Sequence, residues 1–201
     1  VFILFLSVQF AIAQRAPRLS SPDVSSDNSV TFRYYSPNSK NVLLSTEILK
    51  EPIALTKDDK GVWTVTLSKV KPDIYPYSFI VDGVETDDPN NTYLFANERF
   101  KRSIVDVPGN KPLIHSLKNV PHGKISYRFY NSKTLNKTRR VLVYTPPGFN
   151  MQESKKYPVL YLIHGGSDTE ETWTKVGKAN LIADNLIAEG NAKSMIIVMP
   201  Y

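Results

Sequence analysis

The residues best suited to chemistry lie at 164–166, where His-Gly-Gly follows the apolar run 158–163. Glycine lets a backbone approach a ligand closely, so these two glycines can direct their N–H groups at a bound molecule. Ligands of open α/β sheets bind beyond the carboxyl ends of the strands, which is where this motif falls. The segment predicts a binding turn, although on its own it also fits an ordinary turn from a strand into a loop.

A β-α-β unit is predicted to position this motif. The run 158–163 carries no charge, which is typical of a parallel strand covered on both faces. Gly190 is expected to end a helix. The apolar residues of that helix recur at helical spacing: Ala179, Ile182, Ala183, Leu186 and Ile187. The run 195–199 then predicts the parallel partner strand, and alternating segments at 124–130 and 138–144 predict an antiparallel pair ahead of the unit.

The first half of the chain has a different pattern. Short alternating segments separated by turns run from 19 to 108 and predict about seven strands, the number in an immunoglobulin-like sandwich. Asp82-Gly83 predicts a two-residue hairpin, and the segment 75–81 is expected to pair with the segment 62–67. Residues 109–119 lack periodicity and are interpreted as a linker. The α/β region would then occupy residues 120–201.

Composition excludes several classes of site. The chain has no cysteine, which removes disulfides and thiolate metal sites, and nothing in the sequence indicates a metal or a cofactor. The net charge of +6 comes from Lys and Arg that form no run longer than a pair, so we interpret it as solvated surface rather than a nucleic-acid site. With 41% hydrophobic residues, the chain can build a core without covalent cross-links.

Residues 1–13 are almost entirely apolar and are predicted to be a signal peptide. Small residues at Ala11 and Ala13 favour cleavage between Ala13 and Gln14, which would make the protein secreted or periplasmic, with no membrane span after cleavage. A short membrane anchor or a buried strand is the alternative. The chain begins with Val1 and has no charged segment before the apolar run, so we expect the start of the gene to be missing.

Three segments resemble the family 48 carbohydrate-binding module, which is an early-set sandwich. They are Gly61-Val62-Trp63, the segment 75–83 and Asp87-Asp88-Pro89. Glycogen-binding members of that family carry a Trp where this chain has Glu85 and a Lys where it has Ser78, so the resemblance implies weak glycogen binding or none. The aromatic residues left for stacking on another sugar are Trp63, Tyr75, Tyr77 and Tyr93, which equally fit half-buried sandwich positions.

The second half resembles the esterase D-like enzymes of carbohydrate esterase family 1, which are α/β-hydrolases and include feruloyl and acetyl-xylan esterases. The matching segments are 143–149, 157–166, Trp173 and 196–200. The resemblance implies an all-β immunoglobulin-like (early-set) sandwich followed by the N-terminal part of an α/β-hydrolase domain. It further implies a secreted serine carboxylic-ester hydrolase that acts on feruloyl or acetyl groups of plant cell-wall polysaccharide such as xylan. Its partner would be a polysaccharide or oligosaccharide ester.

Acyl transfer by this fold needs a Gly-x-Ser-x-Gly nucleophile turn, an acid, a histidine and N–H donors for the oxyanion. No Gly-x-Ser-x-Gly occurs, so the resemblance places the triad beyond residue 201, and we expect the 201-residue piece to be inactive. The resemblance assigns an oxyanion-hole N–H to Gly166, with Ser167 as the next choice. His164 precedes the position of the nucleophile in the chain, so it is not a candidate for the triad base. The substrate cleft could be lined by Trp173 and by the acidic residues Asp168, Glu170 and Glu171, which also fit the start of a helix.

Two other functions stay open. Siderophore esterases of the enterochelin type also join a sandwich to this hydrolase, but they are expected in the cytoplasm, which conflicts with the predicted signal peptide. Alternatively, a degenerate hydrolase domain could support a non-catalytic carbohydrate-binding protein. The presence of a Gly-x-Ser-x-Gly in the gene past Tyr201 would separate the enzymes from the binding protein.

Overall fold

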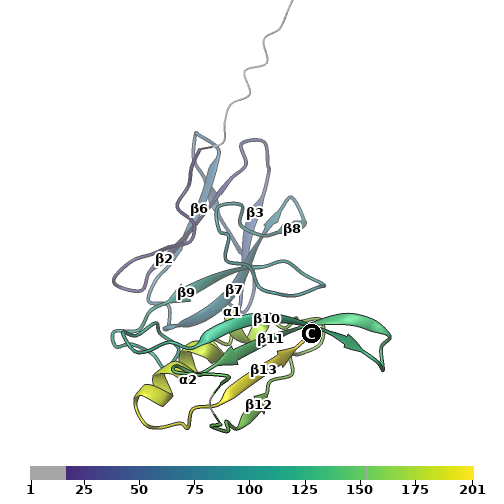
Figure 1. The fold of residues 1–201 in the computed structure, drawn as a ribbon. Helices are drawn as coiled ribbons and strands as arrows, with labels where there is room; N and C mark the ends of the chain where they lie inside the picture. Colours follow the sequence, from purple (N-terminus) through teal and green to yellow (C-terminus); the bar gives the residue numbers. More distant parts are fainter. Residues whose placement is uncertain (1–16, 153) are drawn as a thin grey trace, which may run out of the picture.

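The computed structural model describes residues 17–152 and 154–201, and it shows two β-rich regions connected by residues 109–119, which contain no strand or helix (Figure 1). We call residues 19–108 the sandwich region and residues 120–201 the α/β region. The signal peptide predicted at 1–13 lies outside the described residues. No helix in the described ranges is long and apolar enough to cross a bilayer.

The sandwich region consists of two antiparallel sheets. The strand order is β1-β2-β6-β5 in one sheet and β4-β3-β7-β8 in the other, where β9 also pairs with β7. The strands are β1 Asp23–Val24, β2 Val30–Tyr35, β3 Val42–Thr46, β4 Ile53–Ala54, β5 Thr56–Lys57, β6 Val62–Leu67, β7 Asp73–Val81, β8 Val84–Thr86 and β9 Ser103–Val107. The immunoglobulin-like topology stays a prediction.

The alternating sequence pattern builds the sandwich core. Val30 and Phe32 of β2 are fully buried, as are Val42 and Leu44 of β3, because every second side chain of a strand points to the same face. The buried cluster is Val30, Phe32, Val42, Leu44, Leu55, Trp63, Val70, Tyr77, Phe79, Val105 and Val107. Both sheets contribute to it, so this region has a core of its own.

One turn prediction is confirmed here and one pairing prediction is wrong. Asp82 and Gly83 have φ of 48° and 90° and connect β7 to β8, which is the pattern of a type I′ hairpin. The segment 75–81, however, pairs with β3, β8 and β9 and not with β6. The chain crosses from one sheet to the other between β6 and β7, so consecutive strands are not neighbours.

The α/β region is a four-stranded mixed sheet with two helices. Its strands are β10 Lys124–Ser132, β11 Lys137–Thr145, β12 Val159–Tyr161 and β13 Ile196–Pro200, and its helices are α1 Thr172–Lys175 and α2 Ala179–Ala188. The order is β10-β11-β13-β12. The predicted antiparallel pair β10–β11 and the predicted parallel pair β12–β13 are both confirmed.

Helix α2 packs against this sheet as its apolar pattern predicts. Ala183 joins a buried cluster with Leu142, Tyr144, Ile197 and Met199. The helix ends before Gly190, whose φ of 73° is the left-handed conformation expected just past a helix C-terminus.

The prediction that the run 158–163 is covered on both faces is wrong for the described chain. Val159 and Leu160 are 48% and 42% exposed, and Ile163 is 66% exposed. Strand β12 forms an edge of the sheet, and no described element pairs with its second edge. The apolar composition of a strand indicates that its side chains are to be buried, but it does not identify the element that packs against them.

A buried carboxylate fixes α2 to the sheet. Asp184 is 2% exposed and accepts hydrogen bonds from the Tyr144 hydroxyl at 2.6 Å and the Gly123 N–H at 2.9 Å, with His122 Nδ1 at 2.8 Å. Burial, and then the neighbouring Asp184 carboxylate, raise the pKa of the Tyr144 phenol. The next residue, Asn185, donates to the carbonyls of Ile114 and Ser116 in the linker.

Candidate functional site

The His-Gly-Gly motif follows β12 by two residues, and its two glycines begin a tight turn. The Asp168 N–H donates to the Gly165 carbonyl at 3.2 Å, which closes a four-residue turn over 165–168. Ser167 has φ of 68°, whereas Gly166 is not in the left-handed region, and this combination is the pattern of a type II turn. We call residues 165–168 the glycine turn.

The glycine turn presents two unused donors. Within 17–152 and 154–201, no hydrogen bond engages the N–H of Gly166 or of Ser167. Gly166 is exposed, and a Cβ built on it would meet no atom within 4 Å. A ligand oxygen can therefore reach this backbone, as the sequence suggested.

His164 participates in the local geometry of the turn. Its Nδ1 lies 2.8 Å from the Gly165 carbonyl oxygen, so this nitrogen carries the proton when the hydrogen bond forms. The ring also lies edge-on to Tyr201, with centroids 6.3 Å apart. This placement agrees with a role in shaping the turn.

The other residues expected near the cleft differ in accessibility. Trp173 on α1 packs against the core of the α/β region, and its buried indole N–H meets no acceptor in the part of the chain that is described. Glu170 is fully buried, with Arg140 Nε 2.8 Å from its Oε1, so it does not face a substrate from solvent. Glu171 accepts from the Tyr127 hydroxyl and pairs with Lys175 at 2.6 Å. The hydrogen bond to Glu171, more than burial, raises the pKa of Tyr127 to about 12.

The sandwich aromatics proposed for sugar stacking are mostly structural. Tyr77 is fully buried and its hydroxyl donates to Asp88 at 2.8 Å, and Trp63 is 7% exposed with its indole N–H donating to the Ser36 carbonyl. Neither ring has an open face. Tyr75 is half-buried and donates to the Lys71 carbonyl, and Tyr93 contacts the α/β region.

The two positions that depart from glycogen-binding modules contact each other. The Ser78 hydroxyl donates to Glu85 Oε1 at 2.6 Å, and Arg102 Nε lies 3.3 Å from the same oxygen. Polar side chains bonded to one another thus occupy the positions where glycogen-binding members carry a Trp and a Lys.

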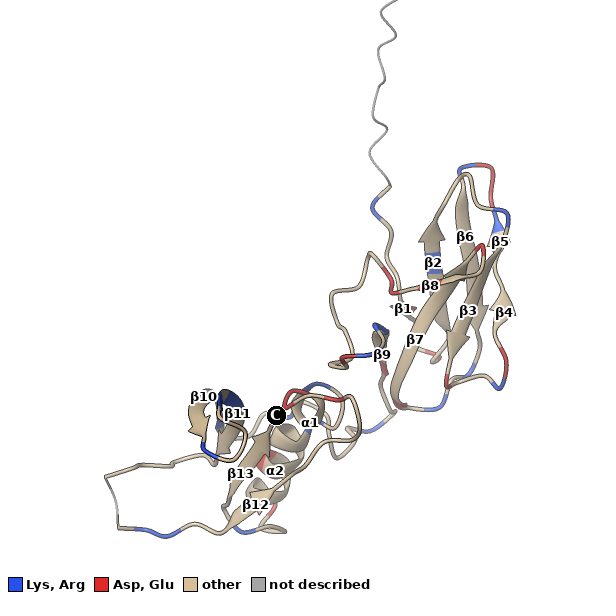
Figure 2. Cartoon of the chain, turned by 90° about the vertical axis from the view of Figure 1, so that its right-hand side faces the viewer, with Lys and Arg blue, Asp and Glu red and all other residues tan. Residues whose placement is uncertain are grey.

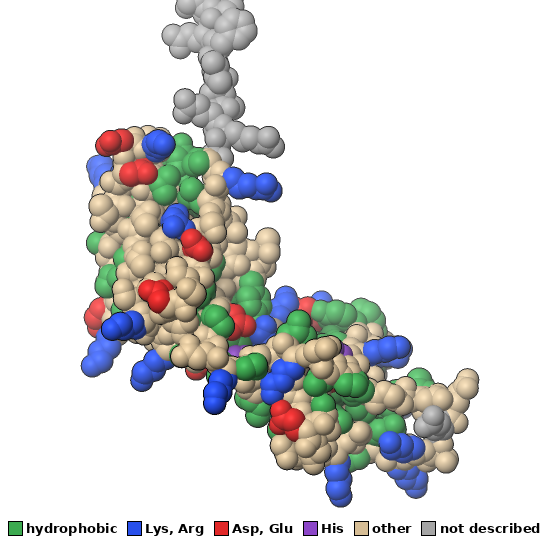
Figure 3. Space-filling view, turned by 90° about the vertical axis from the view of Figure 1, so that its left-hand side faces the viewer, with side chains coloured by type: hydrophobic (Ala, Val, Ile, Leu, Met, Phe, Trp, Pro, Cys, Tyr) green, Lys and Arg blue, Asp and Glu red, His purple; other side chains and the backbone are tan. Residues whose placement is uncertain are grey.

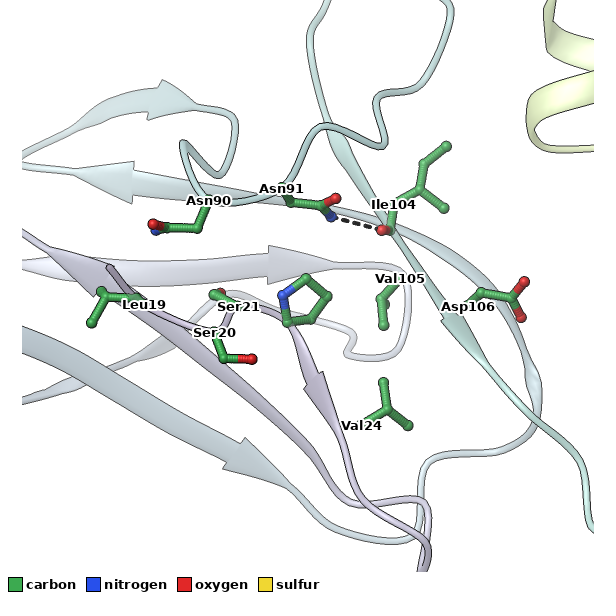
Figure 4. A pocket seen from close by; sticks show the side chains of 10 residues that line it. Leu19, Ser20, Ser21, Val24, Asn90, Asn91, Ile104, Val105 and Asp106 are labelled. Atoms are coloured by element: carbon green, nitrogen blue, oxygen red, sulfur yellow. Dashed lines mark hydrogen bonds between the residues drawn. The ribbon is translucent and has the colours of Figure 1, made fainter. Parts of the chain in front are cut away.

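The sandwich region also contains an open pocket of about 500 Å³ (Figure 4). Ser21 and Val24 line one side, and Asn91, Ile104 and Asp106 line the other, with the Asn91 amide donating to the Ile104 carbonyl at 2.8 Å. Its walls contain no histidine and a single carboxylate, Asp106. Nor does the described chain contain any group of three or more His, Asp or Glu residues that could hold a metal ion.

Surface charge does not single out either region. Lys and Arg lie on loops of both regions and on the β10–β11 hairpin (Figure 2). On the face in Figure 3, hydrophobic side chains form separate patches interspersed with these basic residues.

Two family models match separate parts of the chain. Residues 20–95 match the carbohydrate-binding module 48 (isoamylase N-terminal domain) and residues 132–201 match the family described as "Putative esterase". The two matches fall within the sandwich region and the α/β region, respectively.

Two xylanases are similar to the chain, and one of them is also named a feruloyl esterase. An endo-1,4-beta-xylanase/feruloyl esterase of Xylanibacter ruminicola is 34% identical over 191 residues, which cover 92% of this chain and 26% of that protein. The endo-1,4-beta-xylanase Y of Acetivibrio thermocellus is 36% identical over 67 residues, covering 33% of this chain and 6% of that protein. The chain thus spans about a quarter or less of these relatives.

A solved structure extends the likeness to the fold of both regions. The enterobactin esterase of Shigella flexneri superposes with a TM-score of 0.60 at 15% identity, over 86% of this chain and 50% of that one. At this identity the likeness concerns the fold alone. The chain therefore joins a segment similar to family 48 carbohydrate-binding modules to a segment similar to esterases, and 92% of it aligns with a xylanase/feruloyl esterase.

Proposed function

We propose that this chain belongs to a secreted serine carboxylic-ester hydrolase that removes feruloyl or acetyl groups from plant cell-wall polysaccharide such as xylan. The chain would supply the sandwich at 19–108, the linker at 109–119 and the first part of the hydrolase domain at 120–201. The similarity to a xylanase/feruloyl esterase supports the substrate class. The observation that carries the proposal is the glycine turn, in which Gly166 is exposed and its N–H donates to no described residue.

The chemistry assigned to this turn is stabilisation of an oxyanion. When a serine oxygen attacks an ester carbonyl, the carbonyl oxygen gains negative charge, and backbone N–H groups held in place stabilise that charge without reorganising. One such donor follows the nucleophile, and the other comes from the loop after the third strand of the hydrolase sheet, where Gly166 lies. The serine, histidine and acid of the triad would come from sequence beyond residue 201.

The decisive test is Gly166→Pro in the full-length gene product, assayed on methyl ferulate and an acetyl ester. Proline removes the N–H and suits the second position of a type II turn, so the turn geometry can persist. We expect kcat to fall roughly a hundredfold or more with KM little changed, because the donor acts on charge present in the transition state.

Gly166→Ala is the matched control. A Cβ at this position meets no atom within 4 Å and the N–H is retained, so the Ala variant should keep most of its activity. Circular dichroism must show both variants folded. A folded Gly166→Pro variant with near-normal kcat would move the donor to Ser167, and a wild-type protein inactive on every ester, including a catecholate siderophore ester, would refute the enzyme itself.

Secretion is part of the same proposal. The apolar residues 1–13 would direct export, and cleavage would leave Gln14 as the first residue. Mass spectrometry of the exported protein measures this start directly, and material that retains residue 1 would refute the signal peptide.

A further inference from the structure

A loop of the sandwich region contacts the glycine turn directly. We call residues 93–98, between β8 and β9, the bracing loop. The Glu98 N–H donates to the Ser167 carbonyl at 2.7 Å, and the Asn97 amide donates to Asp168 Oδ1 at 2.8 Å. Asn97 and Asp168 also form an isolated antiparallel bridge. Two consecutive residues of the turn are thus held by two consecutive residues of the loop.

The same loop contacts helix α1 at both of its ends. The Thr172 hydroxyl at the start of α1 donates to the Ala96 carbonyl at 3.1 Å, and the Tyr93 hydroxyl donates to the Lys175 carbonyl at the end. The Lys178 ammonium lies 4.6 Å from the centroid of the Tyr93 ring. In Figures 1 and 2, α1 lies on the side of the α/β region that faces the sandwich.

These contacts fall on strained backbone. Ser167 and Lys178 have φ of 68° and 49°, a conformation that is strained for a residue with a Cβ. Such conformations persist where surrounding contacts fix them, and they are common at functional sites. The bracing loop holds Ser167 by its backbone carbonyl and contacts Lys178 at its side-chain ammonium, so the sandwich region supplies a contact that stabilises the strained backbone at Ser167.

The bracing loop is itself firmly anchored in the sandwich. The Phe95 N–H donates to the Arg102 carbonyl at 2.9 Å, and the Ile104 N–H of β9 donates to the Tyr93 carbonyl at 2.8 Å. Asn97 Oδ1 accepts the N–H groups of Arg99 and Phe100. The loop can therefore transmit the position of β9 to the glycine turn.

From this geometry we infer that the bracing loop positions the oxyanion donors, so that the sandwich region contributes to the ester-hydrolysis step itself. The inference rests on the proposed function, because it concerns the Gly166 and Ser167 N–H groups as oxyanion donors. Donors of this kind act only when held close to the productive geometry, and a misplacement of 1 Å can cost about a hundredfold in rate. Asn97 and Glu98 act through the turn and are positioning residues.

A positioning role differs measurably from carbohydrate binding. If the sandwich only bound polysaccharide, changing it would weaken action on polymers and leave a small soluble ester unaffected. If the bracing loop sets the turn, hydrolysis of methyl ferulate must also slow, because the donors serve every substrate. The loss should appear in kcat with KM within about twofold, since the donors are aligned with charge present only in the transition state.

The test compares Glu98→Pro with Glu98→Ala in the full-length gene product. Proline deletes the N–H that holds the Ser167 carbonyl, whereas alanine keeps it and removes only an exposed side chain. We expect kcat on methyl ferulate to fall about 10- to 100-fold in the Pro variant and to stay near wild type in the Ala variant. Adding Ser167→Gly to Glu98→Pro should restore part of the rate, because glycine adopts positive φ without external support.

A second variant covers the case in which Glu98→Pro does not fold. Asn97→Asp keeps the oxygen that accepts from Arg99 and Phe100 but replaces the donor to Asp168 with a like charge. It should lower kcat in the same way. A folded Asn97→Asp variant with wild-type kcat would overturn the inference, as would a loss confined to polymeric substrate.

Amide hydrogen exchange separates this inference from the proposed function. In the 201-residue chain, the Asp168 N–H that closes the glycine turn should exchange faster in Glu98→Pro than in Glu98→Ala. If this holds while the wild-type full-length protein hydrolyses no ester, the proposed function fails and the structural coupling of the two regions stands. If the protein is an active esterase and neither exchange nor kcat responds to Glu98→Pro, the bracing inference alone is overturned.

Discussion

The sandwich region and the α/β region differ in how completely the described chain buries their apolar strands. The sandwich buries a cluster of eleven hydrophobic residues between two sheets. The α/β region buries five, and strand β12, which precedes the glycine turn, leaves its side chains largely exposed. The proposed binding turn therefore follows the less covered of the two structures.

In the 201-residue chain, this difference makes the contacts between the two regions a source of stability for the glycine turn. Backbone at the end of an edge strand with little covering is expected to be mobile, because few buried contacts oppose its local opening. The contacts of the bracing loop fall on that backbone. The sandwich region, which has a buried core of its own, can thus stabilise the glycine turn, to which strand β12 gives little support.

The largest effect should come from the sandwich core. Phe79 is fully buried and its ring lies 4.9 Å from Tyr34 and 5.9 Å from Tyr77, centroid to centroid. Phe79→Ala should lower the free energy of unfolding of the sandwich by about 3–5 kcal/mol. The chain has two tryptophans, Trp63 in the sandwich and Trp173 in the α/β region, so urea unfolding followed by Trp63 fluorescence in a Trp173→Phe background reports this region alone.

Leu160 on β12 provides the contrast. It is 42% exposed, and Leu160→Ala in the 201-residue chain should change the free energy of unfolding by no more than about 0.5 kcal/mol, monitored by Trp173 in a Trp63→Phe background. A loss comparable to that of Phe79→Ala would mean that β12 is buried in solution and that the two regions are equally self-sufficient.

An intermediate effect is expected from the polar attachment of α2. Asp184→Ala leaves the buried Tyr144 hydroxyl without its acceptor and should destabilise the α/β region by about 2–3 kcal/mol. Asp184→Asn keeps one acceptor oxygen and should cost less. Equal unfolding midpoints for the Ala variant and wild type in a Trp63→Phe background would contradict the role given to this carboxylate.

Local sequence pattern predicted most elements of the fold and several of their pairings, but not the neighbours of the segment 75–81. Alternation located strands such as β2, and helical spacing with Gly190 located α2, because both signals arise within one element. The pairing of the segment 75–81 was mispredicted because the partner of a strand depends on where the chain crosses between sheets. The prediction that β12 is buried on both faces was wrong for a related reason, since apolar composition carries no information about which element packs against a strand.

The candidate site divides in the same way. The His-Gly-Gly motif at a strand end indicated an accessible turn, and the structure places Gly166 in one. The positive φ of Ser167 had no signal in its residue type, because serine is not typical of that conformation. The contacts that hold this turn could not be predicted from the sequence either, since Asn97 and Asp168 are 71 positions apart and neither belongs to a periodic segment. The burial of Trp63 and Tyr77 likewise depends on the packing of two sheets.

The smallest effect concerns the surface carboxylates, and it again compares the two regions. Asp82 in the sandwich hairpin accepts the backbone N–H groups of Lys40 and Asn41 at 2.9 and 2.8 Å, and the Asn41 bond is the main cause that lowers the Asp82 pKa below its ordinary value of 3.8. In the α/β region, the hydrogen bond from the Lys118 ammonium lowers the pKa of Glu189. A lowered folded-state pKa means that the stabilisation is present above the unfolded value and is lost as the pH falls through the folded one.

Asp82→Asn should therefore reduce sandwich stability slightly at pH 7 and have a smaller effect below the lowered folded-state pKa, where the wild-type carboxyl is also neutral. Asparagine tolerates the positive φ of this hairpin position, so the turn should survive the change. Glu189→Gln should give a weaker pH dependence still, because its partner is a flexible lysine rather than fixed backbone, and exposed ion pairs contribute little. Unfolding curves at pH 7 and at pH 2.5, read by the tryptophan of each region, make the comparison. A larger pH-dependent loss of unfolding free energy for Glu189→Gln than for Asp82→Asn would contradict this expectation. It would show that the carboxylate of the sandwich hairpin is not the more rigidly held of the two.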